Sequence, residues 1–360
     1  MKILHITDHL GLGGAQSLLK EICNSKEEFY CYILRRKENE LQIQNRNLFF
    51  RNSRSRLDIL SLFEIKRLIR EQNITILHCH LQKSFISGYI VKIIFFKNIK
   101  LIFHEHGNIF KNRFFYNLFL RKAQKKVNLF IAVSKATKQK LIESGRINPK
   151  KIEVLYNCLD LDKFNINRIN FNLQEERAKI GIREASFVVG FAGRITQRKG
   201  WREIIKVTKV ISNTYQNFKL LIAGDGPDRN KMINFIKKLQ LSDKVIYLGA
   251  VSNMNWFYRL LDCYVMPSYW EPMGITAIEA QSCSVPVIAT NVEGLNEIVR
   301  DNENALLFQL GNEEELAKKI NLLYRDNTLR DRLIKNGLKN SKKYSLNSYT
   351  KELMSIYERS

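Results

Sequence analysis

The feature that most constrains the fold is a regular alternation of short apolar runs with helical patterns along the chain of 360 residues. Short runs that are apolar throughout are typical of parallel strands that are buried on both faces. Two successive strand–helix series predict an α/β protein with two doubly wound, Rossmann-like domains facing across a cleft. The expected strands are 2–6, 30–34, 75–79, 100–103, 129–133, 152–155, 187–192, 218–222, 245–248, 263–266, 286–289 and 305–308.

The break between the two series lies in a stretch rich in Asn and Asp, at about 158–172. We therefore expect an N-terminal domain over 1–172 and a C-terminal domain over 173–340. Residues 341–360 predict a final helix that can pack back toward the N-terminal domain. Ligands of such folds bind at the carboxyl ends of the strands, so the loops that follow strands are the places to search for chemistry.

A glycine cluster follows the first expected strand, in MKILHITDHLGLGGAQSLLKEI. Strand, glycine turn and helix together form a common phosphate-binding layout. The dinucleotide fingerprint G-x-G-x-x-G fails here, because Gln16 stands at its third glycine. The next apolar run ends in Arg35 and Arg36 instead of the acid that binds a ribose. A dehydrogenase is therefore disfavoured, while a phosphate loop at Gly13 and Gly14 and a tight turn without a ligand both stay open.

Positive charge is concentrated in the first half of the chain. The formal net charge is +24, and residues 41–150 carry 22 Lys and Arg against 5 Asp and Glu, a balance of +17. Such a field attracts nucleic acid or an anionic membrane face. No nucleic-acid-binding signature accompanies it, and no apolar stretch is long enough to span a bilayer. With no signal peptide visible, we expect a cytoplasmic protein, peripheral on the cytoplasmic face of the membrane.

The second half contains loops with cations and glycines after its strands. In VVGFAGRITQRKGW, Arg194 and Lys199 follow a strand and Gly200 opens a helix. Two cations beside a helix N-terminus suit a diphosphate, and a solvated basic loop is the alternative. The turn at 224–227 is expected to give structural support. The stretch ATNVEGLNEIV predicts a further helix start at Gly294.

The most informative stretch is EPMGITAIEA, in which two acids flank a helix start. Glu271 precedes the helix and Glu279 lies inside it, with seven residues between them. The free N–H groups of Gly274, Ile275 and Thr276 suit phosphate oxygens, and carboxylates suit sugar hydroxyls. The pattern therefore favours one elongated ligand with phosphate in the middle and a sugar at each end. The alternative is a surface Glu271 with an ion-paired Glu279.

In this order, the motifs resemble the retaining GT-B nucleotide-sugar glycosyltransferases, often called glycosyltransferase family four. The resemblance runs from Met1 to roughly Val299. It rests on GLGGAQ, with Gln16 where an acid is usual, and on HEHG (104–107), IAVSKATKQKLI, VLYNCLDLDKF, GFAGRITQRKG and EPMGITAIEA.

The resemblance implies roles for the residues of the second half. Arg194 and Lys199 would hold the donor diphosphate, and Glu279 would bind the nucleotide ribose. Glu271 would contact hydroxyls of the transferred sugar. The cations and the helix start at Gly274 would stabilise the charge that builds on the leaving diphosphate. No cofactor and no metal ion are expected, because the positive side chains take the part of the metal.

In the first half, the resemblance implies that Gly13 and Gly14 let the backbone approach the donor phosphate or the acceptor. It also implies that His106 sits near the reacting sugar, and a core histidine beside His104 is the alternative. A metal site is disfavoured because no acid or thiol completes a set and no cysteine has zinc spacing. The histidines considered for it are His78, His80, His104 and His106.

Residues 108–128 predict an amphipathic helix with an aromatic face and a basic face. Such a helix suits an anionic membrane surface, and a core-facing helix with a solvated back is the alternative. We favour the membrane because the whole first domain is basic. The aromatic and aliphatic face holds Phe110, Phe114 and Leu118, and the cations are Lys111, Arg121, Lys122, Lys125 and Lys126.

The sequence as a whole predicts an enzyme that transfers a hexose or N-acetylhexosamine from a nucleoside diphosphate sugar, by default a UDP-sugar. The expected acceptor is a lipid-linked or cell-envelope glycan, such as lipopolysaccharide or capsule. No nucleic-acid partner is expected. The alternatives are a basic nucleic-acid- or nucleotide-binding protein on a Rossmann-like scaffold, and an epimerase or phosphorylase on the same fold.

Overall fold

The computed structural model describes residues 1–11, 13–35, 42–44, 46–51, 58–107, 114–166 and 171–360. The chain divides into two compact units. Unit 1 comprises Met1–Cys158 and Leu346–Ser360, and unit 2 comprises Leu159–Ser345. At the edge of unit 2 the backbone N–H of Leu159 donates to the carbonyl of Tyr344 (2.8 Å), so the two connecting segments run side by side. The described residues 159–166 and 171–172, which the sequence analysis expected in the N-terminal domain, belong to unit 2.

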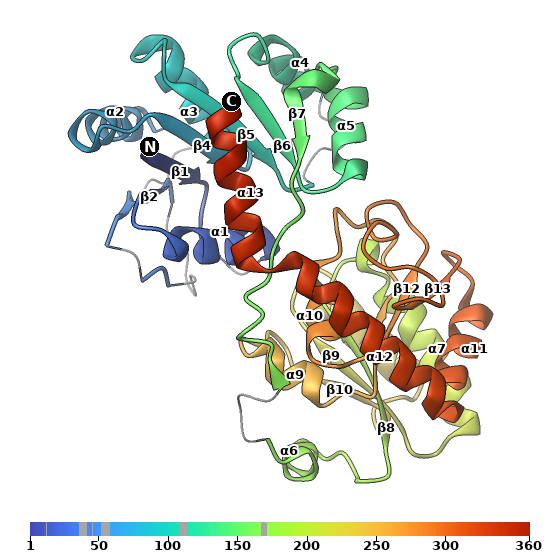
Figure 1. The fold of residues 1–360 in the computed structure, drawn as a ribbon. Helices are drawn as coiled ribbons and strands as arrows, with labels where there is room; N and C mark the ends of the chain where they lie inside the picture. The colour runs from blue at the N-terminus through green and yellow to red at the C-terminus, as the bar shows by residue number, and fades with distance from the viewer. Residues whose placement is uncertain (12, 36–41, 45, 52–57, 108–113, 167–170) are drawn as a thin grey trace. The chain divides into compact units, whose positions relative to one another are not determined.

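Unit 1 is built on a seven-stranded sheet whose described pairings are all parallel (Figure 1). The strand order is β3-β2-β1-β4-β5-β6-β7. The strands are β1 (Ile3–Thr7), β2 (Phe29–Ile33), β3 (Leu48–Phe50), β4 (Ile76–His80), β5 (Lys100–Glu105), β6 (Leu129–Ala132) and β7 (Ile152–Val154).

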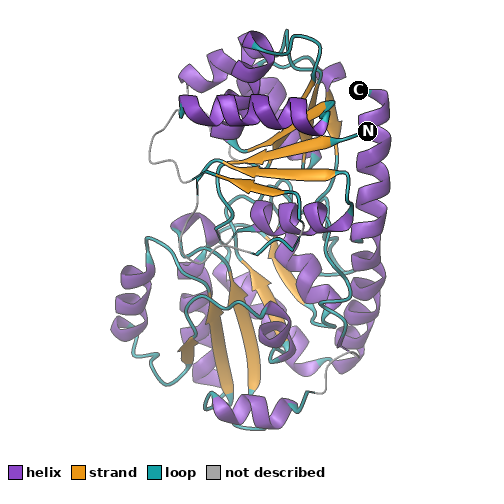
Figure 2. Ribbon diagram, turned by 90° about the vertical axis from the view of Figure 1, so that its left-hand side faces the viewer, coloured by secondary structure: helices purple, strands orange, loops and turns teal. Residues whose placement is uncertain are grey.

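Helices cover both faces of this sheet (Figure 2). On one face, Leu4 and Ile6 of β1 share a core with buried side chains of α2, α3, α4 and α5. On the other face, Ile3 packs with side chains of α1 and with Leu353 of the last helix, α13. The end of the chain thus completes the core of the first sheet. The helices are α1 (Gly14–Ser25), α2 (Ile59–Gln72), α3 (Gln82–Ile94), α4 (Phe114–Ala123), α5 (Lys135–Gly145) and α13 (Leu346–Arg359).

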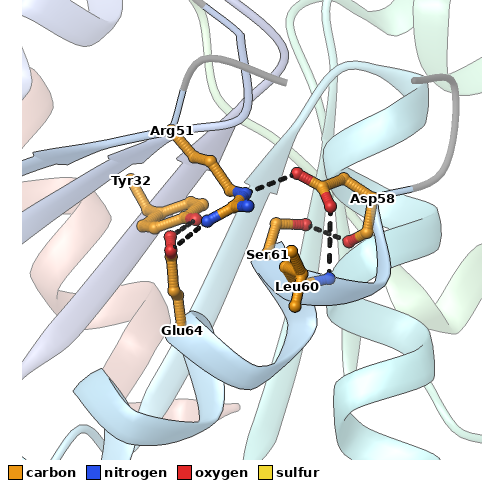
Figure 3. A network of polar contacts seen from close by, with 6 residues as sticks. All are labelled: Tyr32, Arg51, Asp58, Leu60, Ser61 and Glu64. Atoms are coloured by element: carbon orange, nitrogen blue, oxygen red, sulfur yellow. Dashed lines mark hydrogen bonds and ion pairs between the residues drawn. The ribbon is translucent and has the colours of Figure 1, made fainter. Parts of the chain in front are cut away.

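A polar network joins the β2–β3 edge of unit 1 to the start of α2 (Figure 3). Arg51 donates to Asp58 (2.7 Å) and to Glu64 (2.5 Å), and the hydroxyl of buried Tyr32 donates to Glu64 (2.5 Å). Asp58 also caps α2, because its side chain accepts from the N–H of Leu60 (3.2 Å). Charge-assisted hydrogen bonds of this kind fix the entry of a helix.

Unit 2 repeats the design with a six-stranded parallel sheet in the order β10-β9-β8-β11-β12-β13. Its strands are β8 (Phe187–Ala192), β9 (Phe218–Ala223), β10 (Val245–Tyr247), β11 (Cys263–Met266), β12 (Val287–Thr290) and β13 (Leu306–Phe308). Its helices are α6 (Leu173–Lys179), α7 (Trp201–Thr214), α8 (Arg229–Lys238), α9 (Met254–Arg259), α10 (Ile275–Ser282), α11 (Glu313–Arg325) and α12 (Asn327–Ser341).

The prediction of two doubly wound α/β domains is confirmed, and each of the twelve expected strands overlaps an observed one. The sequence analysis missed β3, whose three residues lie at the edge of the sheet and are only partly buried. The helix expected to start at Gly294 is wrong. Residues 293–298 form turns instead, held by backbone bonds such as Leu295 N–H to the carbonyl of Val292 (3.2 Å).

Each sheet has a point where the strand order reverses, and ligands of open α/β sheets bind there, beyond the carboxyl ends of the strands. In unit 2 this point lies between β8 and β11, which pair directly. In unit 1 it lies between β1 and β4. The loops that follow these four strands carry most of the residues singled out from the sequence.

Candidate active site

In unit 2 the loops after β8 and β11 are held together by close backbone approach. The backbone N–H of Tyr269 donates to the carbonyl of Arg198 (2.8 Å). Gly200, which caps α7, has φ +74°, and a Cβ there would lie 1.9 Å from the carbonyl oxygen of Pro267. Only glycine permits both this conformation and this approach. The two loops therefore form one surface at the carboxyl edge of the sheet.

On this surface Lys199 forms an ion pair with Glu271. The ammonium Nζ lies 2.5 Å from the carboxylate Oε2, and the side chains are 19% and 9% exposed. The sequence placed Lys199 at a diphosphate and Glu271 at a sugar, and the structure brings the two side chains into contact. An ammonium has three N–H donors, so Lys199 can keep Glu271 and still donate to a phosphate oxygen.

Arg194 lies in the same loop with an exposed side chain. Within the described residues its guanidinium has no hydrogen-bond or ion-pair partner. The adjacent backbone is firmly held, since Ile195 donates to the carbonyl of Asp225 (3.0 Å) and accepts from the N–H of Asp228 (3.1 Å). The supporting role predicted for the turn at 224–227 agrees with these bonds. A free guanidinium on a fixed loop is suited to a mobile anionic ligand.

Helix α10 begins at this surface without a capping side chain. Gly274 is its N-cap with φ +93°, and a Cβ there would lie 3.7 Å from Cγ of Glu271. No side chain accepts from the first-turn N–H groups, so those of Ile275 and Thr276 are available to an anion. The helix start therefore lies beside the Lys199–Glu271 pair.

Glu279 lies one turn further along α10, where the hydroxyl of buried Tyr258 donates to its Oε2 (2.8 Å). Burial raises the pKa of Glu279 to about 7, although this hydrogen bond lowers it. Burial also raises the pKa of Tyr264, and the negative charges of Glu279 and Glu271 raise it further. The alternative of an ion-paired Glu279 is not seen among the described residues, where Tyr258 is its side-chain partner.

Gly294 supports the same surface from a third loop, which follows β12. Its φ is +83°, and a Cβ there would lie 2.1 Å from the carbonyl oxygen of Glu271 and 2.8 Å from that of Pro272. The sequence analysis treated this glycine as a helix start. Its observed role is to let the backbone of the Glu271 loop pass close by.

In unit 1 the glycine cluster opens helix α1. Gly14 is its first residue and Gly13 its N-cap, with no side-chain cap. A Cβ on Gly13 would lie 2.5 Å from Oε1 of Gln16, a buried side chain. Gln16 thus lies at this helix start.

His106 follows β5 and is hydrogen bonded to His80. Its Nε2 lies 3.0 Å from Nδ1 of His80, and Nε2 of His80 lies 3.0 Å from Nδ1 of His5. Burial lowers the pKa of His106 to about 3, so the ring is neutral near pH 7. Each contact joins one donor to one acceptor, so the tautomer of His106 is coupled to those of His80 and His5.

Two further polar residues, Asp8 and Tyr258, were not singled out from the sequence. The carboxylate of Asp8, directly after β1, accepts from the N–H groups of Ser84 (2.7 Å) and Lys83 (3.3 Å) at the start of α3. Burial raises its pKa against the effect of these bonds. The position of Asp8 directly after a strand is a sequence signal that could have identified it as a candidate. Tyr258 has no such signal, because only the tertiary packing of α9 brings it to Glu279 of α10.

The helix predicted over 108–128 is observed as α4, Phe114–Ala123, and residues 108–113, with Phe110 and Lys111, lie outside the described residues. Phe114 and Phe115 are 72% and 85% exposed. The opposite side of the helix is buried through Leu120 and Ala123. The helix is therefore both core-facing and aromatic toward solvent. Its exposed cations are Arg121 and Lys122, with Lys125 and Lys126 just beyond its end.

The six cysteines are free and buried. Among the described helices, none combines the length and apolarity that a bilayer crossing requires.

Comparison with known proteins links this geometry to a family. Residues 172–340 match the model for glycosyl transferases group 1, and residues 26–163 match that for glycosyltransferase family 4. The capsular polysaccharide biosynthesis glycosyltransferase CapM of Staphylococcus aureus is 30% identical over 83% of this chain and 80% of its own length.

Other relatives align over less of their length. The UDP-Gal:α-D-GlcNAc-diphosphoundecaprenol α-1,3-galactosyltransferase of Escherichia coli is 27% identical over 74% of this chain and 70% of its own. An uncharacterized glycosyltransferase of Methanocaldococcus jannaschii is 30% identical over 63% of this chain and 59% of its own length.

Among solved structures, HepE from Anabaena in complex with UDP and glucose has a TM-score of 0.89 at 19% identity, with all of both chains covered. This likeness extends over both units. The sequence matches and the doubly wound pair of sheets agree, and the chain belongs to the GT-B glycosyltransferases of the group 1 and family 4 type.

Proposed function

We propose that this glycosyltransferase moves a hexose or N-acetylhexosamine from a UDP-sugar to a glycan or glycolipid of the cell envelope, with retention of configuration. The observation that carries the proposal is the contact between Lys199 and Glu271 at 2.5 Å, next to exposed Arg194 and the uncapped start of α10. Cations, free amides and a carboxylate in one place match a diphosphate that is bonded to a sugar.

The donor would lie along this surface. Arg194, Lys199 and the amides of Ile275 and Thr276 would bind the diphosphate, while Glu271 accepts from hydroxyls of the transferred sugar. Glu279 would accept from the ribose, where its pKa of about 7 gives a carboxyl that titrates near neutral pH. We propose that no metal ion is needed, because these positive groups stabilise the leaving diphosphate directly.

In the proposed reaction the bond between the anomeric carbon and the diphosphate oxygen breaks, and the electron pair stays on the diphosphate. The oxygen of an acceptor hydroxyl bonds to the same carbon and its proton passes to the leaving diphosphate. Catalytic roles are proposed for Arg194, Lys199 and Glu271 in unit 2 and for His106 in unit 1, whose ring is held neutral by burial.

The relatives support the choice of donor and acceptor. CapM is named for capsular polysaccharide biosynthesis, the Escherichia coli enzyme for a UDP-sugar donor and a lipid diphosphate acceptor, and HepE was solved with UDP and glucose. Against the nucleic-acid alternative, the cation Lys199 is paired with a carboxylate, Glu271, beside the uncapped start of α10.

A donor panel tests the proposal. The full chain, with EDTA present, is expected to melt higher with UDP than with GDP or ADP, and to hydrolyse at least one UDP-hexose slowly when no acceptor is added. The second measurement is a competition between RNA and UDP for binding to the chain. RNA should not displace UDP. Stabilisation by RNA alone, or a strict requirement for a divalent ion, would contradict the proposal.

We also propose that unit 1 binds an anionic membrane surface, where a lipid-linked acceptor would be met. The support is the exposed pair Phe114 and Phe115 on α4 beside exposed lysines, within the basic stretch 41–150. Aromatic side chains with flanking cations favour the interface of an anionic bilayer.

Reversing Lys122, Lys125 and Lys126 to Glu is expected to weaken binding to phosphatidylglycerol–phosphatidylcholine vesicles by more than about 100-fold, since each basic residue near such a surface contributes about 1 kcal/mol. Co-sedimentation measures it. The matched control reverses Lys231, Lys237 and Lys238 of α8, which are exposed in unit 2, and should leave binding much closer to the unmodified level. Equal binding by both triple variants would reject the α4 surface.

A further inference from the structure

Five histidines form a continuous column on one face of the sheet of unit 1. The rings contact one another in sequence, with centroids 4.2–5.4 Å apart, and β1, β4 and β5 contribute them as neighbouring strands (Figure 1). The histidine column consists of His5, His78, His80, His104 and His106. Five imidazoles are far more polar surface than a sheet core ordinarily holds.

Several nitrogens of the column lack a hydrogen-bond partner among the described residues. Both ring nitrogens of His104 are buried and unpartnered, and so is Nδ1 of His106. His104 is 0% exposed, and His80, its neighbour across the sheet, is 1% exposed. A buried polar atom without a partner is unfavourable, and such atoms commonly mark a place for an ion or an ordered water.

His80, His104 and His106 can direct one nitrogen each toward a common point. Their ligand nitrogens all lie within 4.8 Å of one another, and Nδ1 of His80 is 3.0 Å from Nε2 of His106. Two nitrogens bound at 2.1 Å in a tetrahedral site are about 3.4 Å apart, which falls inside this range. His104 stacks on His106, and neither of its ring nitrogens has a hydrogen bond that a metal ion would have to replace.

A second triad, His5, His78 and His80, has similar spacing but is less suited. His5 is hydrogen bonded to His80 and His78 to the hydroxyl of Tyr357 (2.5 Å), so a metal would have to replace two hydrogen bonds there, against the single His80–His106 bond of the first triad. Both rings are also 0% exposed. His106, in contrast, is partly exposed at the carboxyl end of its strand, which gives an ion a way in.

We propose that His80, His104 and His106 form a binding site in unit 1 for a divalent transition-metal ion of the zinc class. Three imidazoles with a water in the fourth position are an established ligand set for such an ion. All three ligands belong to unit 1.

Cobalt(II) alone, added to the full chain after EDTA treatment and dialysis, is the probe. One equivalent should bind and give the intense visible absorption of a four-coordinate ion, and zinc should abolish that absorption by displacing it. His104→Phe and His106→Gln should each weaken binding more than about 100-fold, because even the loss of a residue that only orients a metal ligand costs 10–100-fold.

Two comparisons keep the test decisive. His104→Phe removes two unpartnered nitrogens, so without metal this variant should melt no lower than the unmodified chain. If it fails to fold, His106→Gln is the second variant, because it changes a ring that is partly exposed. His5→Gln lies in the column but outside the triad and should retain the cobalt spectrum. The proposal is overturned if cobalt(II) gives no four-coordinate spectrum; the unpartnered nitrogens would then bind water. It is also overturned if, of the three variants, only His5→Gln abolishes the spectrum.

Discussion

Replacing Arg194 and Lys199 together by alanine is expected to lower kcat for glycosyl transfer by at least about 1,000-fold. Each preorganised group that faces the developing charge of a transition state is worth about 3–4 kcal/mol. The two effects should not add fully, because both cations act on one diphosphate. The measurement is the initial rate of sugar transfer, or of donor hydrolysis, at saturating UDP-sugar.

The single variants separate chemistry from folding. Arg194 is exposed and without a partner among the described residues, so Arg194→Ala should reduce transfer about 100- to 1,000-fold with an unchanged Tm. Lys199→Ala leaves the carboxylate of Glu271, a residue only 7% exposed, without its cation, so it should also lower the Tm.

A matched control removes two positive charges from the same unit at a distance from the proposed site. Lys237 and Lys238, exposed at the end of α8, serve this purpose when both are changed to alanine. This control should transfer at close to the unmodified rate. The proposed donor site fails if the control and the Arg194/Lys199 pair lose activity equally, or if the pair retains full turnover.

The strands and the two-domain organisation could be predicted from the sequence because parallel strands buried on both faces are marked by local composition. The run at 187–192, for example, is apolar throughout and is observed as β8. β3 carries no such mark, since an edge strand of three partly buried residues has little apolar surface to bury. A local pattern cannot report pairing that is decided by neighbouring strands.

The helix expected at Gly294 failed for a related reason. A glycine followed by Leu, Asn and Glu has the composition of a helix start. What selects turns here is the backbone of Glu271 and Pro272, which lies where a Cβ of residue 294 would be. That contact joins loops after two different strands, and no window of sequence around Gly294 contains it.

In the candidate site too, the positions of residues after strands could be predicted from the sequence, and their side-chain contacts could not. The sequence placed Arg194, Lys199 and Glu271 in loops that follow strands, which follows from the rule that chemistry in these folds gathers at carboxyl ends. It did not anticipate the ion pair between Lys199 and Glu271, or the bond from Tyr258 to Glu279. These contacts depend on side-chain distances across the sheet, which register and packing set.

Replacing Gly294 by alanine should lower the free energy of unfolding by more than about 3 kcal/mol and reduce sugar transfer about 100-fold. The left-handed backbone alone costs a non-glycine residue about 1–2 kcal/mol. The new Cβ would in addition lie 2.1 Å from the carbonyl oxygen of Glu271, so that loop must move. A displacement of about 1 Å in a positioning group is enough for a loss of this size in rate.

Gly311→Ala supplies the matched control, because it isolates the backbone cost from the collision. Gly311 has φ +80°, close to the +83° of Gly294, but a Cβ there would meet nothing within 4 Å. Chemical denaturation should therefore show a loss of only about 1–2 kcal/mol for Gly311→Ala, with transfer preserved. If both variants lose the same stability and Gly294→Ala keeps its activity, then the loop after β12 does not act by allowing the backbone of Glu271 to pass close to Gly294. If Gly294→Ala alone loses both, the position of Glu271 beside Lys199 is set by the absence of a single methyl group across the sheet.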